Sequence, residues 1–310
     1  MNNTITAVPG LRVGHAQNDE AMTGCTVILC EGGAVGGVDQ RGGAPGTRET
    51  DLLRPMHRVE QIHGVLLTGG SAFGLDATGG VMRYLEERGI GFDVGVARVP
   101  IVPAAVIFDL AIGRADVRPD ATMAYQACLN ATTDPAIEGS VGAGTGATVG
   151  KILGMQNATK AGVGSACVEI IDGLFVGAIA VVNALGDVID PHTGQIIAGA
   201  RSEDGFADTL QVMQKFHAMS SASANNTVIG VVATNAKLTK EEANKVAQMA
   251  HDGLARAIRP AHTMYDGDTI FALSTGEVQA DVNLIGAFAA EVFAEAIVRG
   301  VKAAQERRDE

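Results

Sequence analysis

The sequence predicts a single α/β domain in which helices cover layers of β-strands. Short apolar runs rich in valine and isoleucine alternate with helical patterns along all 310 residues. No internal repeat and no proline- or serine-rich linker divides the chain. Glycine is unusually frequent, with 40 residues, whereas aromatic residues make up only 4% and tryptophan is absent. A core of small aliphatic side chains suits sheets and helices that pack at close approach.

The strands are predicted from short apolar runs whose length and β-branched content are typical of buried sheet. Along the chain these runs cover residues 25–30, 64–67, 104–110, 174–182, 228–233 and 269–273.

The helices are predicted from apolar residues spaced three and four apart. One helix begins with a capping box, in which Thr239 is followed three residues later by Glu242, and its pattern stops at Pro260. A second is predicted over 282–304 and a third over 72–88.

Charge and composition exclude several classes of function. The net charge of −12 argues against nucleic acid and against an anionic membrane surface as partners. No apolar run reaches the roughly 18–20 residues of a membrane span, and no signal peptide is visible at the start. The four cysteines lack a C-x-x-C spacing, which favours buried free thiols. We expect a cytoplasmic, acidic protein.

The glycine-rich stretch GSVGAGTGATVGKILG, residues 139–154, does not fit a nucleotide-binding loop. A phosphate loop needs glycine where Thr145 stands and serine or threonine where Ile152 stands. The spacing Gly-x-Gly-x-x-Ala at 142–147 resembles a dinucleotide fingerprint, but no apolar strand precedes it. The loop either packs against other backbone or lets a substrate approach the backbone, with Lys151 at its end. We expect no cofactor.

Two polar features follow or precede predicted strands. Asp266 and Asp268 stand just before a strand, where they form an ordinary turn or orient a nucleophile or an amine. Ile270 excludes an EF-hand, because it occupies the place of the third oxygen ligand. Asn183 closes a strand, either as a turn former or as an oxyanion donor.

Other catalytic patterns are absent from the sequence. Ser71 approaches a G-x-S-x-G elbow, but Phe73 replaces its second glycine. No H-x-x-x-H pair or Cys/His cluster indicates a metal. The histidines are scattered and suggest no triad: His15, His57, His63, His192, His217, His251 and His262.

Residues 220–238, SSASANNTVIGVVATNAKL, change character at Thr227. The small and polar residues up to Asn226 are typical of an exposed loop, whereas 228–233 form an apolar strand. No glycine or proline separates the two parts. The loop over 214–226 is the part of the chain that suggests a processing or hinge site.

Together these stretches resemble one family, the self-processing N-terminal-nucleophile amidases of the DmpA type. Within it the sequence looks most like the nylon-oligomer (6-aminohexanoate oligomer) endohydrolases. The resembling blocks, in order, are DQRGGAPGTRETDLL, LTGGSAFGLDATGGV, AAVIFDL, the glycine loop, VVNALGD, NNTVIGVVATNA and DGDTIFALST. They cover nearly the whole chain, and their order makes the resemblance specific.

The resemblance implies a fold and an assembly. The fold is an αββα sandwich, two stacked sheets between helix layers, and the assembly is a homotetramer. The precursor of such a protein cuts itself before the nucleophile, which here is the bond between Asn226 and Thr227. One domain of 1–310 would thus become two chains, 1–226 and 227–310.

The resemblance also implies roles for single residues. Thr227 becomes the nucleophile, and Asn183 stabilises the oxyanion. Lys151 matches the lysine after the glycine loop of the nylon hydrolases, and Lys160 is a second candidate because the aminopeptidase branch has a lysine in a similar stretch. Asp266 and Asp268 match two carboxylates near the nucleophile.

Three functions remain open from the sequence. The first is hydrolysis of linear amides, such as 6-aminohexanoate oligomers or short peptides. The second is an aminopeptidase that releases small N-terminal L-, D- or β-amino acids. The third is a non-catalytic small-molecule binding protein, which has no need of a cleavable Asn-Thr junction.

Overall fold

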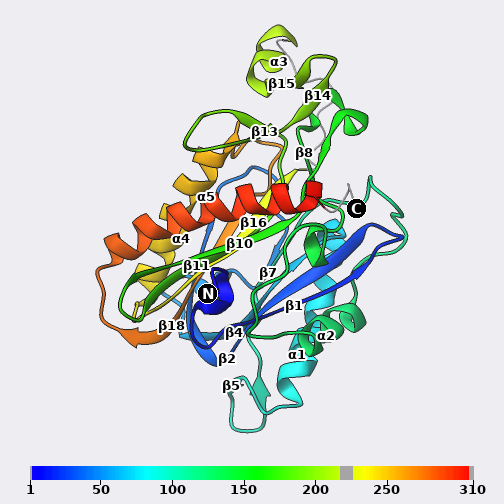
Figure 1. Cartoon of the computed structure of the whole chain (residues 1–310). Coiled ribbons are helices and arrows are strands. Elements are labelled where there is room, and N and C mark those ends of the chain that lie inside the picture. The colour runs from blue at the N-terminus through cyan, green and yellow to red at the C-terminus, as the bar shows by residue number, and fades with distance from the viewer. Residues whose placement is uncertain (1, 217–225, 307–310) are drawn as a thin grey trace.

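The computed structural model describes residues 2–216 and 226–306, and it contains one large sheet flanked by helices (Figure 1). The strand order is β10-β11-β16-β18-β2-β4-β7-β3, with β1 beside β2. β16 pairs in parallel with β18, as β4 does with β7, and the other neighbours are antiparallel. The nine strands are β1 (Arg12–Asn18), β2 (Thr23–Gln40), β3 (Thr47–Arg48), β4 (Gln61–Thr68), β7 (Ala104–Val106), β10 (Val163–Ile171), β11 (Leu174–Asn183), β16 (Thr227–Ala236) and β18 (Thr269–Val278).

The long strand β2 makes the sheet continuous and also folds it into two layers. Its first half pairs with β1 and its second half with β18, and its register with β4 shifts between Leu29 and Ala34. An irregularity of this kind bends a strand. β16 therefore also contacts β4 and β7, with which it has no pairing.

A helix layer covers each side of the folded sheet (Figure 1). α4 (Lys240–Ala257) and α5 (Val282–Glu306) pack against each other, α4 on β2 and β18 and α5 on β10 and β11. α1 (Thr78–Glu86) and α2 (Ala121–Leu129) cover β1, β2 and β4. The expected αββα arrangement is confirmed.

The two cores follow from the alternation of side chains along a strand. In β2, Cys25, Val27 and Leu29 belong to the smaller core under α1 and α2. Ile28 and Cys30 point the other way, into the large core shared with β11, β16, α4 and α5. Of the four cysteines, which form no disulfide, Cys25, Cys30 and Cys128 are buried and Cys167 is half-buried.

All six predicted strands are present in the structure, but each differs from its prediction at one or both ends. The run 25–30 is part of a strand of 18 residues, because the glycine-rich continuation to Gln40 also pairs. The run 104–110 keeps strand geometry only to Val106. Sequence reasoning did not predict β10, α2 or α3 (Thr209–Phe216).

The predicted helices are confirmed with corrections at their ends. The capping box exists: the Thr239 hydroxyl accepts from Glu242 N at 3.2 Å, and the Glu242 carboxylate accepts from Thr239 N at 2.8 Å. α4 ends at Ala257, before Pro260, because Ile258 and Arg259 pair with β12 as a short strand. The region 72–88 starts as a 3₁₀ helix, Ser71–Ala77, before α1 begins.

The remaining elements are short and lie outside the main sheet. α3, β14 and β15 stand out from the body of the molecule at the top of Figure 1. The strands are β5 (Phe92–Asp93), β6 (Arg98–Val99), β8 (Thr148–Val149), β9 (Thr159–Lys160), β12 (Asp187–Ile189), β13 (Ile196–Ala198), β14 (Ala200–Ser202), β15 (Gly205–Ala207) and β17 (Ile258–Arg259). The 3₁₀ helices besides Ser71–Ala77 are Ile5–Ala7, Asp51–Leu53, Gly142–Gly144, Lys151–Leu153 and Met155–Asn157. Within the described ranges, no helix combines the length and apolar character needed to cross a membrane.

The position of β16 depends on close packing at one glycine. A Cβ atom on Gly230 would lie 2.4 Å from the Ile179 carbonyl oxygen and 2.6 Å from the Phe293 ring. Only glycine therefore lets α5 and β11 approach β16 this closely. Most of the loop that precedes β16, residues 217–225, lies outside the described residues.

Candidate active site

The sheet brings the predicted junction together with two distant segments. Thr227 is the first residue of β16 and pairs with Asn183, the last residue of β11. Asn226 forms an isolated parallel bridge with Asp266, just before β18. Asn226 and Thr227 are buried, with 3% and 5% of their surface exposed. The turn before β18 and the end of β11 thus flank the Asn-Thr bond.

The hydroxyl of Thr227 contacts the carbonyl group that precedes it. Thr227 Oγ1 donates a hydrogen bond to the carbonyl oxygen of Asn226. The same oxygen accepts a second hydrogen bond, of 2.9 Å, from Gly267 N. A hydroxyl group and a polarised carbonyl group therefore lie side by side within one dipeptide.

Asn183 is fully buried, and its side chain binds groups from two other segments. Its Oδ1 accepts from Lys151 Nζ at 2.7 Å and from Thr148 N at 3.1 Å. Its Nδ2 donates to the Phe108 carbonyl at 3.1 Å. These bonds fix the amide plane beside Thr227. The asparagine that closes β11 thus belongs to the polar cluster at the junction.

Lys151 holds its ammonium against Asn183 in a poorly solvated place. Its Nζ also donates to the Asn183 carbonyl at 2.8 Å. Burial lowers the pKa of Lys151 to about 7, while the negative charges of Asp266 and Asp109 act in the opposite direction. The lysine is therefore poised to gain or lose a proton near neutral pH.

Asp109 is a neighbour of this cluster that sequence reasoning missed. It is buried, and its carboxylate accepts from Thr23 Oγ1 at 2.6 Å and from Gly70 N at 2.7 Å. Burial raises the pKa of Asp109. The available signal was a charged residue near the end of the predicted apolar run 104–110.

The two carboxylates of the Asp-Gly-Asp turn bind different strands. Asp268 Oδ1 accepts from Val228 N at 2.7 Å, so it holds the beginning of β16 directly. Asp266 Oδ1 accepts from Leu185 N at 3.3 Å, just beyond β11. Burial and the nearby charge of Asp268 raise the pKa of Asp266. The turn therefore holds both the beginning of β16, where the junction lies, and the segment just beyond β11, which pairs with β16.

His262 is a second residue that the sequence did not indicate. Its Nδ1 lies 2.8 Å from Asp268 Oδ2, and its backbone N donates to the same oxygen at 3.0 Å. Its backbone has a left-handed φ of 57°, which is uncommon for a residue other than glycine. Its ring packs edge-to-face on His251, with centroids 4.8 Å apart. The available signal was its position, four residues before Asp266.

His251 supports this arrangement from inside the protein. It is almost fully buried on α4, and its Nε2 lies 3.0 Å from the carbonyl oxygen of Asp39 on β2. Burial lowers the pKa of His251 to about 4, so the ring is neutral at physiological pH.

Lys160, the second candidate lysine, has a different environment. Its Nζ donates to three backbone carbonyls, those of Gly144 at 2.9 Å, Ala147 at 3.0 Å and Ala161 at 2.6 Å. These bonds close the glycine loop on itself. The structure thus places Lys151 against Asn183 and Lys160 inside the loop.

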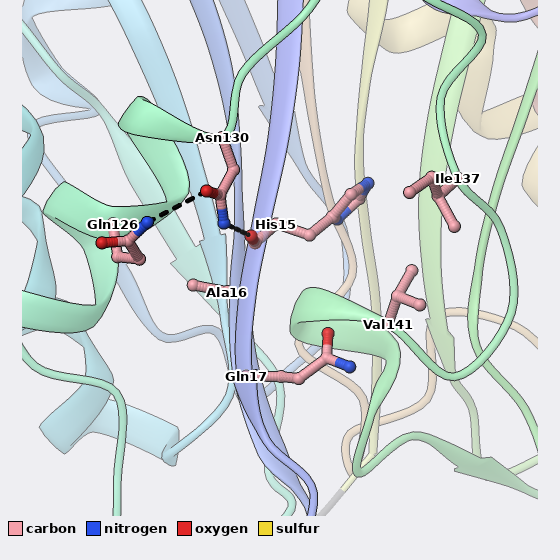
Figure 2. A pocket seen from close by; sticks show the side chains of 7 residues that line it. All are labelled: His15, Ala16, Gln17, Gln126, Asn130, Ile137 and Val141. Atoms are coloured by element: carbon pink, nitrogen blue, oxygen red, sulfur yellow. Dashed lines mark hydrogen bonds between the residues drawn. The ribbon is translucent and has the colours of Figure 1, made fainter.

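A separate open pocket of about 420 Å³ lies between β1, α2 and the start of the glycine loop (Figure 2). Asn130 connects two of its walls, because its side chain donates to the His15 carbonyl at 2.9 Å and accepts from Gln126 at 3.0 Å. None of the predicted site residues lines it. In the part of the chain that the structure describes, no three His, Cys, Asp or Glu residues are grouped as a metal site would require.

The fold and the family comparison define a hydrolase that acts on amide bonds. The model of peptidase family S58 matches residues 3–309, and the chain belongs to this family. It is 45% identical to an uncharacterized aminopeptidase of Mycobacterium tuberculosis (strain ATCC 25618 / H37Rv), covering 98% of this chain and 94% of that protein. It is 30% identical to a 6-aminohexanoate-oligomer endohydrolase of Kocuria sp. (strain KY2), covering 95% and 84%.

Solved structures with the same fold confirm the architecture. The L-aminopeptidase D-Ala-esterase/amidase of Ochrobactrum anthropi, described as a variant of the Ntn hydrolase fold, superposes with a TM-score of 0.75 at 21% identity. The match covers 98% of this chain and 86% of that one. A Burkholderia sp. beta-aminopeptidase gives a TM-score of 0.67 at 23% identity, covering 98% and 87%. At these identities the likeness concerns the fold alone.

Replacement of the two lysines should separate a role in chemistry from a role in folding. Lys151→Ala is expected to lower amide turnover by a factor on the order of 10²–10³, because the Asn183 amide loses the Nζ donor that orients it. Lys160→Met should instead destabilise the fold by at least about 2 kcal/mol, since buried carbonyls lose their donor. Steady-state kinetics and denaturant unfolding would measure the two effects. An inactive Lys160→Met with unchanged stability, beside a fully active Lys151→Ala, would reverse the assignment.

The lowered pKa of Lys151 also predicts a pH-dependent contribution to stability. Between about pH 7 and 10 the unfolded chain holds a proton on this lysine that the folded chain has lost, so the folded protein gains stability as pH rises. In an uncut Thr227→Ala background, the further change Lys151→Met should remove this gain, which is at most about 1.4 kcal/mol per pH unit. Urea unfolding across this range would detect it. If the stability of the two proteins changed with pH in the same way, the lowered pKa of Lys151 would be contradicted.

Replacement of His262 should act through the orientation of Asp268. His262→Ala is expected to slow turnover by about 10- to 100-fold, because the carboxylate loses its side-chain donor and can move. His262→Asn should restore most of the rate, since its amide can donate in the same direction and asparagine tolerates a left-handed backbone. His192→Ala, at an exposed histidine, is the matched control. Equal losses in the alanine and asparagine variants would show that only the ring packing matters.

Proposed function

We propose that this chain is a self-processing amide hydrolase whose nucleophile is Thr227. The observation that carries the proposal is the contact between Thr227 Oγ1 and the Asn226 carbonyl, buried at the mouth of β16. The hydroxyl lies within reach of the carbonyl group that it would attack, as a near-attack arrangement requires. The family assignment supports hydrolysis of amide bonds, and the likeness to the Ochrobactrum anthropi structure, described as a variant of the Ntn hydrolase fold, supports the fold in which the site lies.

Maturation would proceed by an acyl shift within the Asn-Thr dipeptide. Thr227 Oγ1 forms a bond to the Asn226 carbonyl carbon, and the hydroxyl proton ends on the departing nitrogen of Thr227. The product is an ester between Asn226 and Thr227 with a free α-amine. Water then hydrolyses the ester to a carboxylate at Asn226 and restores the hydroxyl of Thr227.

Turnover of a substrate would use the same hydroxyl with a new base. The freed α-amine has an ordinary pKa of about 7.7–8.0, so roughly a fifth to a third of it is neutral near physiological pH and can take the hydroxyl proton. The Asn183 amide would stabilise the oxyanion, and Lys151 would keep that amide oriented. Asp266 and Asp268 would hold the strand ends that carry the nucleophile. The acyl-enzyme would then be released by water.

The substrates we propose are linear amides, such as 6-aminohexanoate oligomers or short peptides. The second candidate is an aminopeptidase that releases small N-terminal L-, D- or β-amino acids. It is favoured by one observation: the mycobacterial relatives named as aminopeptidases share more identity with this chain than the nylon-oligomer hydrolases do, 45% against 30%.

Oligomers labelled at one end would distinguish the two candidates. Internal cuts release labelled fragments of several lengths from the start of the reaction. An aminopeptidase instead removes one unit at a time from the amino end. Chromatography of early time points would therefore decide between them.

Substitution of Thr227 tests the proposal as a whole. The purified protein is expected to contain two associated chains, 1–226 and 227–310, because β16 lies buried in the sheet. Thr227→Ala should remain one chain and be inactive, whereas Thr227→Ser should retain part of both reactions. Mass spectrometry and an amide-release assay give the readouts. Cleavage after Asn226 in Thr227→Ala, or full activity of uncut protein, would disprove the nucleophile.

We further propose that the protein assembles as a homotetramer. Closed assemblies with an even number of copies are common among soluble enzymes, and exposed apolar residues such as Phe206 and Leu210 on the projecting region could be covered there. Light scattering at micromolar concentration should give about four times the mass of one 1–310 unit. A monomeric mass would refute this.

A further inference from the structure

The middle residue of the Asp-Gly-Asp turn contacts the bond that the proposed function cuts. Gly267 N donates to the carbonyl oxygen of Asn226 at 2.9 Å, and Thr227 Oγ1 contacts the same oxygen. During an attack by this hydroxyl, negative charge develops on that oxygen. A backbone N–H already directed at it is the kind of donor that stabilises an oxyanion.

We propose that the backbone N–H of Gly267 is the oxyanion donor for self-cleavage, whereas hydrolysis of external substrates depends on the Asn183 amide. This inference rests on the proposed function, because it assigns a catalytic group to the maturation step. The two reactions differ in how their carbonyl group is held. In maturation the carbonyl belongs to Asn226, and the bridge to Asp266 fixes its direction. A substrate carbonyl has no such connection to the chain.

The N–H group is held in place before any reaction. The turn is fixed from both sides, because Ala44 N donates to the Asp266 carbonyl at 2.8 Å and Arg41 N donates to the Asp268 carbonyl at 3.0 Å. A donor fixed in this way needs no reorganisation as charge develops.

The site also explains why glycine stands between the two aspartates. A Cβ atom on residue 267 would lie 2.6 Å from the Ala44 carbonyl oxygen and 3.0 Å from Thr227 Oγ1. A larger residue would therefore move the turn away from the junction or press on the nucleophile. Close approach of the backbone to the reacting atoms requires the missing side chain.

The two flanking carboxylates accept hydrogen bonds from other donors. Asp266 accepts from Leu185 N at 3.3 Å and from Thr263 N at 3.1 Å. Asp268 accepts from Val228 N at 2.7 Å and from His262 at 2.8 Å. Each of the four carboxylate oxygens of Asp266 and Asp268 thus has a donor of its own. The N–H between them remains directed at the Asn226 carbonyl.

In the reaction, Thr227 Oγ1 bonds to the Asn226 carbonyl carbon, and the electron pair of the C=O double bond moves onto the oxygen. The Gly267 N–H stabilises this oxygen while the tetrahedral intermediate exists. The pair then returns, the C–N bond breaks, and the Thr227 nitrogen leaves as an amine with the former hydroxyl proton. Water completes cleavage by hydrolysing the ester.

Replacement of one peptide bond by an ester tests the proposal in the full chain. Incorporation of glycolic acid at position 267 by nonsense suppression removes the N–H and leaves the side chain unchanged. The matched control is lactic acid at position 44, which removes the hydrogen bond from Ala44 N to the same turn without touching the Asn226 carbonyl. Mass spectrometry over time gives the rate of cleavage, and turnover is normalised to the cleaved fraction.

The expected result is a separation of the two rates. The ester at 267 should slow cleavage by about 10²–10³, the loss typical of one oxyanion donor, while normalised turnover changes by less than about tenfold. The ester at 44 should affect cleavage by less than about tenfold. Cleavage of the 267 ester at the unaltered rate, or equal losses in cleavage and turnover, would overturn the inference and leave the nucleophile assignment intact.

A second variant keeps the test decisive if the 267 ester does not fold. Gly267→Ala retains the N–H but displaces it, so cleavage should slow by at least about tenfold, and unaltered cleavage would overturn the inference. Thr227→Ala is the reference for the proposed function. If that protein is still cut after Asn226, the proposed function itself fails, and this result is distinct from all of those above.

Discussion

The register of β16 between β11 and β18 is the constraint on which the site depends. It sets Thr227 opposite Asn183 and Asn226 beside Asp266, so three segments far apart in the sequence meet at one bond. Because side chains alternate along a strand, a slip of one residue would turn Thr227 to the opposite face. Gly230 opposes such a slip, because a neighbouring residue in its place would bring a Cβ atom to about the position that lies 2.4 Å from the Ile179 carbonyl oxygen.

The same register brings ionisable groups of opposite charge together in a buried part of the protein. Lys151 lies against Asn183, the charges of Asp109 and Asp266 act on it from other elements, and Asp268 lies near Asp266. Burial acts on the two kinds of group in opposite senses, lowering the pKa of the lysine and raising those of Asp109 and Asp266. The pKa of each of these three groups is thus moved toward neutral pH, where a group can most readily exchange protons with its neighbours. Backbone donors satisfy the carboxylates, so the cluster is held by the fold as much as by its own charges.

Sequence reasoning reached the main elements because their signals are local. The apolar runs, the capping box at Thr239 and the change of character at Thr227 each depend on neighbours in the chain. Sequence reasoning failed for elements that form only because a segment distant in the sequence pairs with them or packs against them. The glycine-rich half of β2 is a strand only because β18 pairs with it, and α2 has no strong signal apart from the core that it covers.

The site was predictable from the resemblance more than from physics alone. Asn183, Asp266 and Asp268 each had an ordinary explanation as turn residues, and only their meeting at Thr227 favours chemistry. His262 and Asp109 could not be identified from the resemblance, because only the folded structure brings His262 to Asp268 and Asp109 to Lys151. The preference for Lys151 over Lys160 gains a geometric reason, since only the former binds Asn183 among the contacts described.

The position of β16 inside the sheet determines how well the molecule could fold before and after a cut. β16 is bonded to β11 on one edge and to β18 on the other, and α4, β18 and α5 follow it in the chain. A cut before Thr227 would therefore leave a molecule whose two pieces are interleaved in one core. Such a core forms readily while the pieces are one chain, because their meeting is then intramolecular. After the cut, an unfolded copy would have to find its other half by diffusion, so the mature protein would owe its shape to a connection it no longer has.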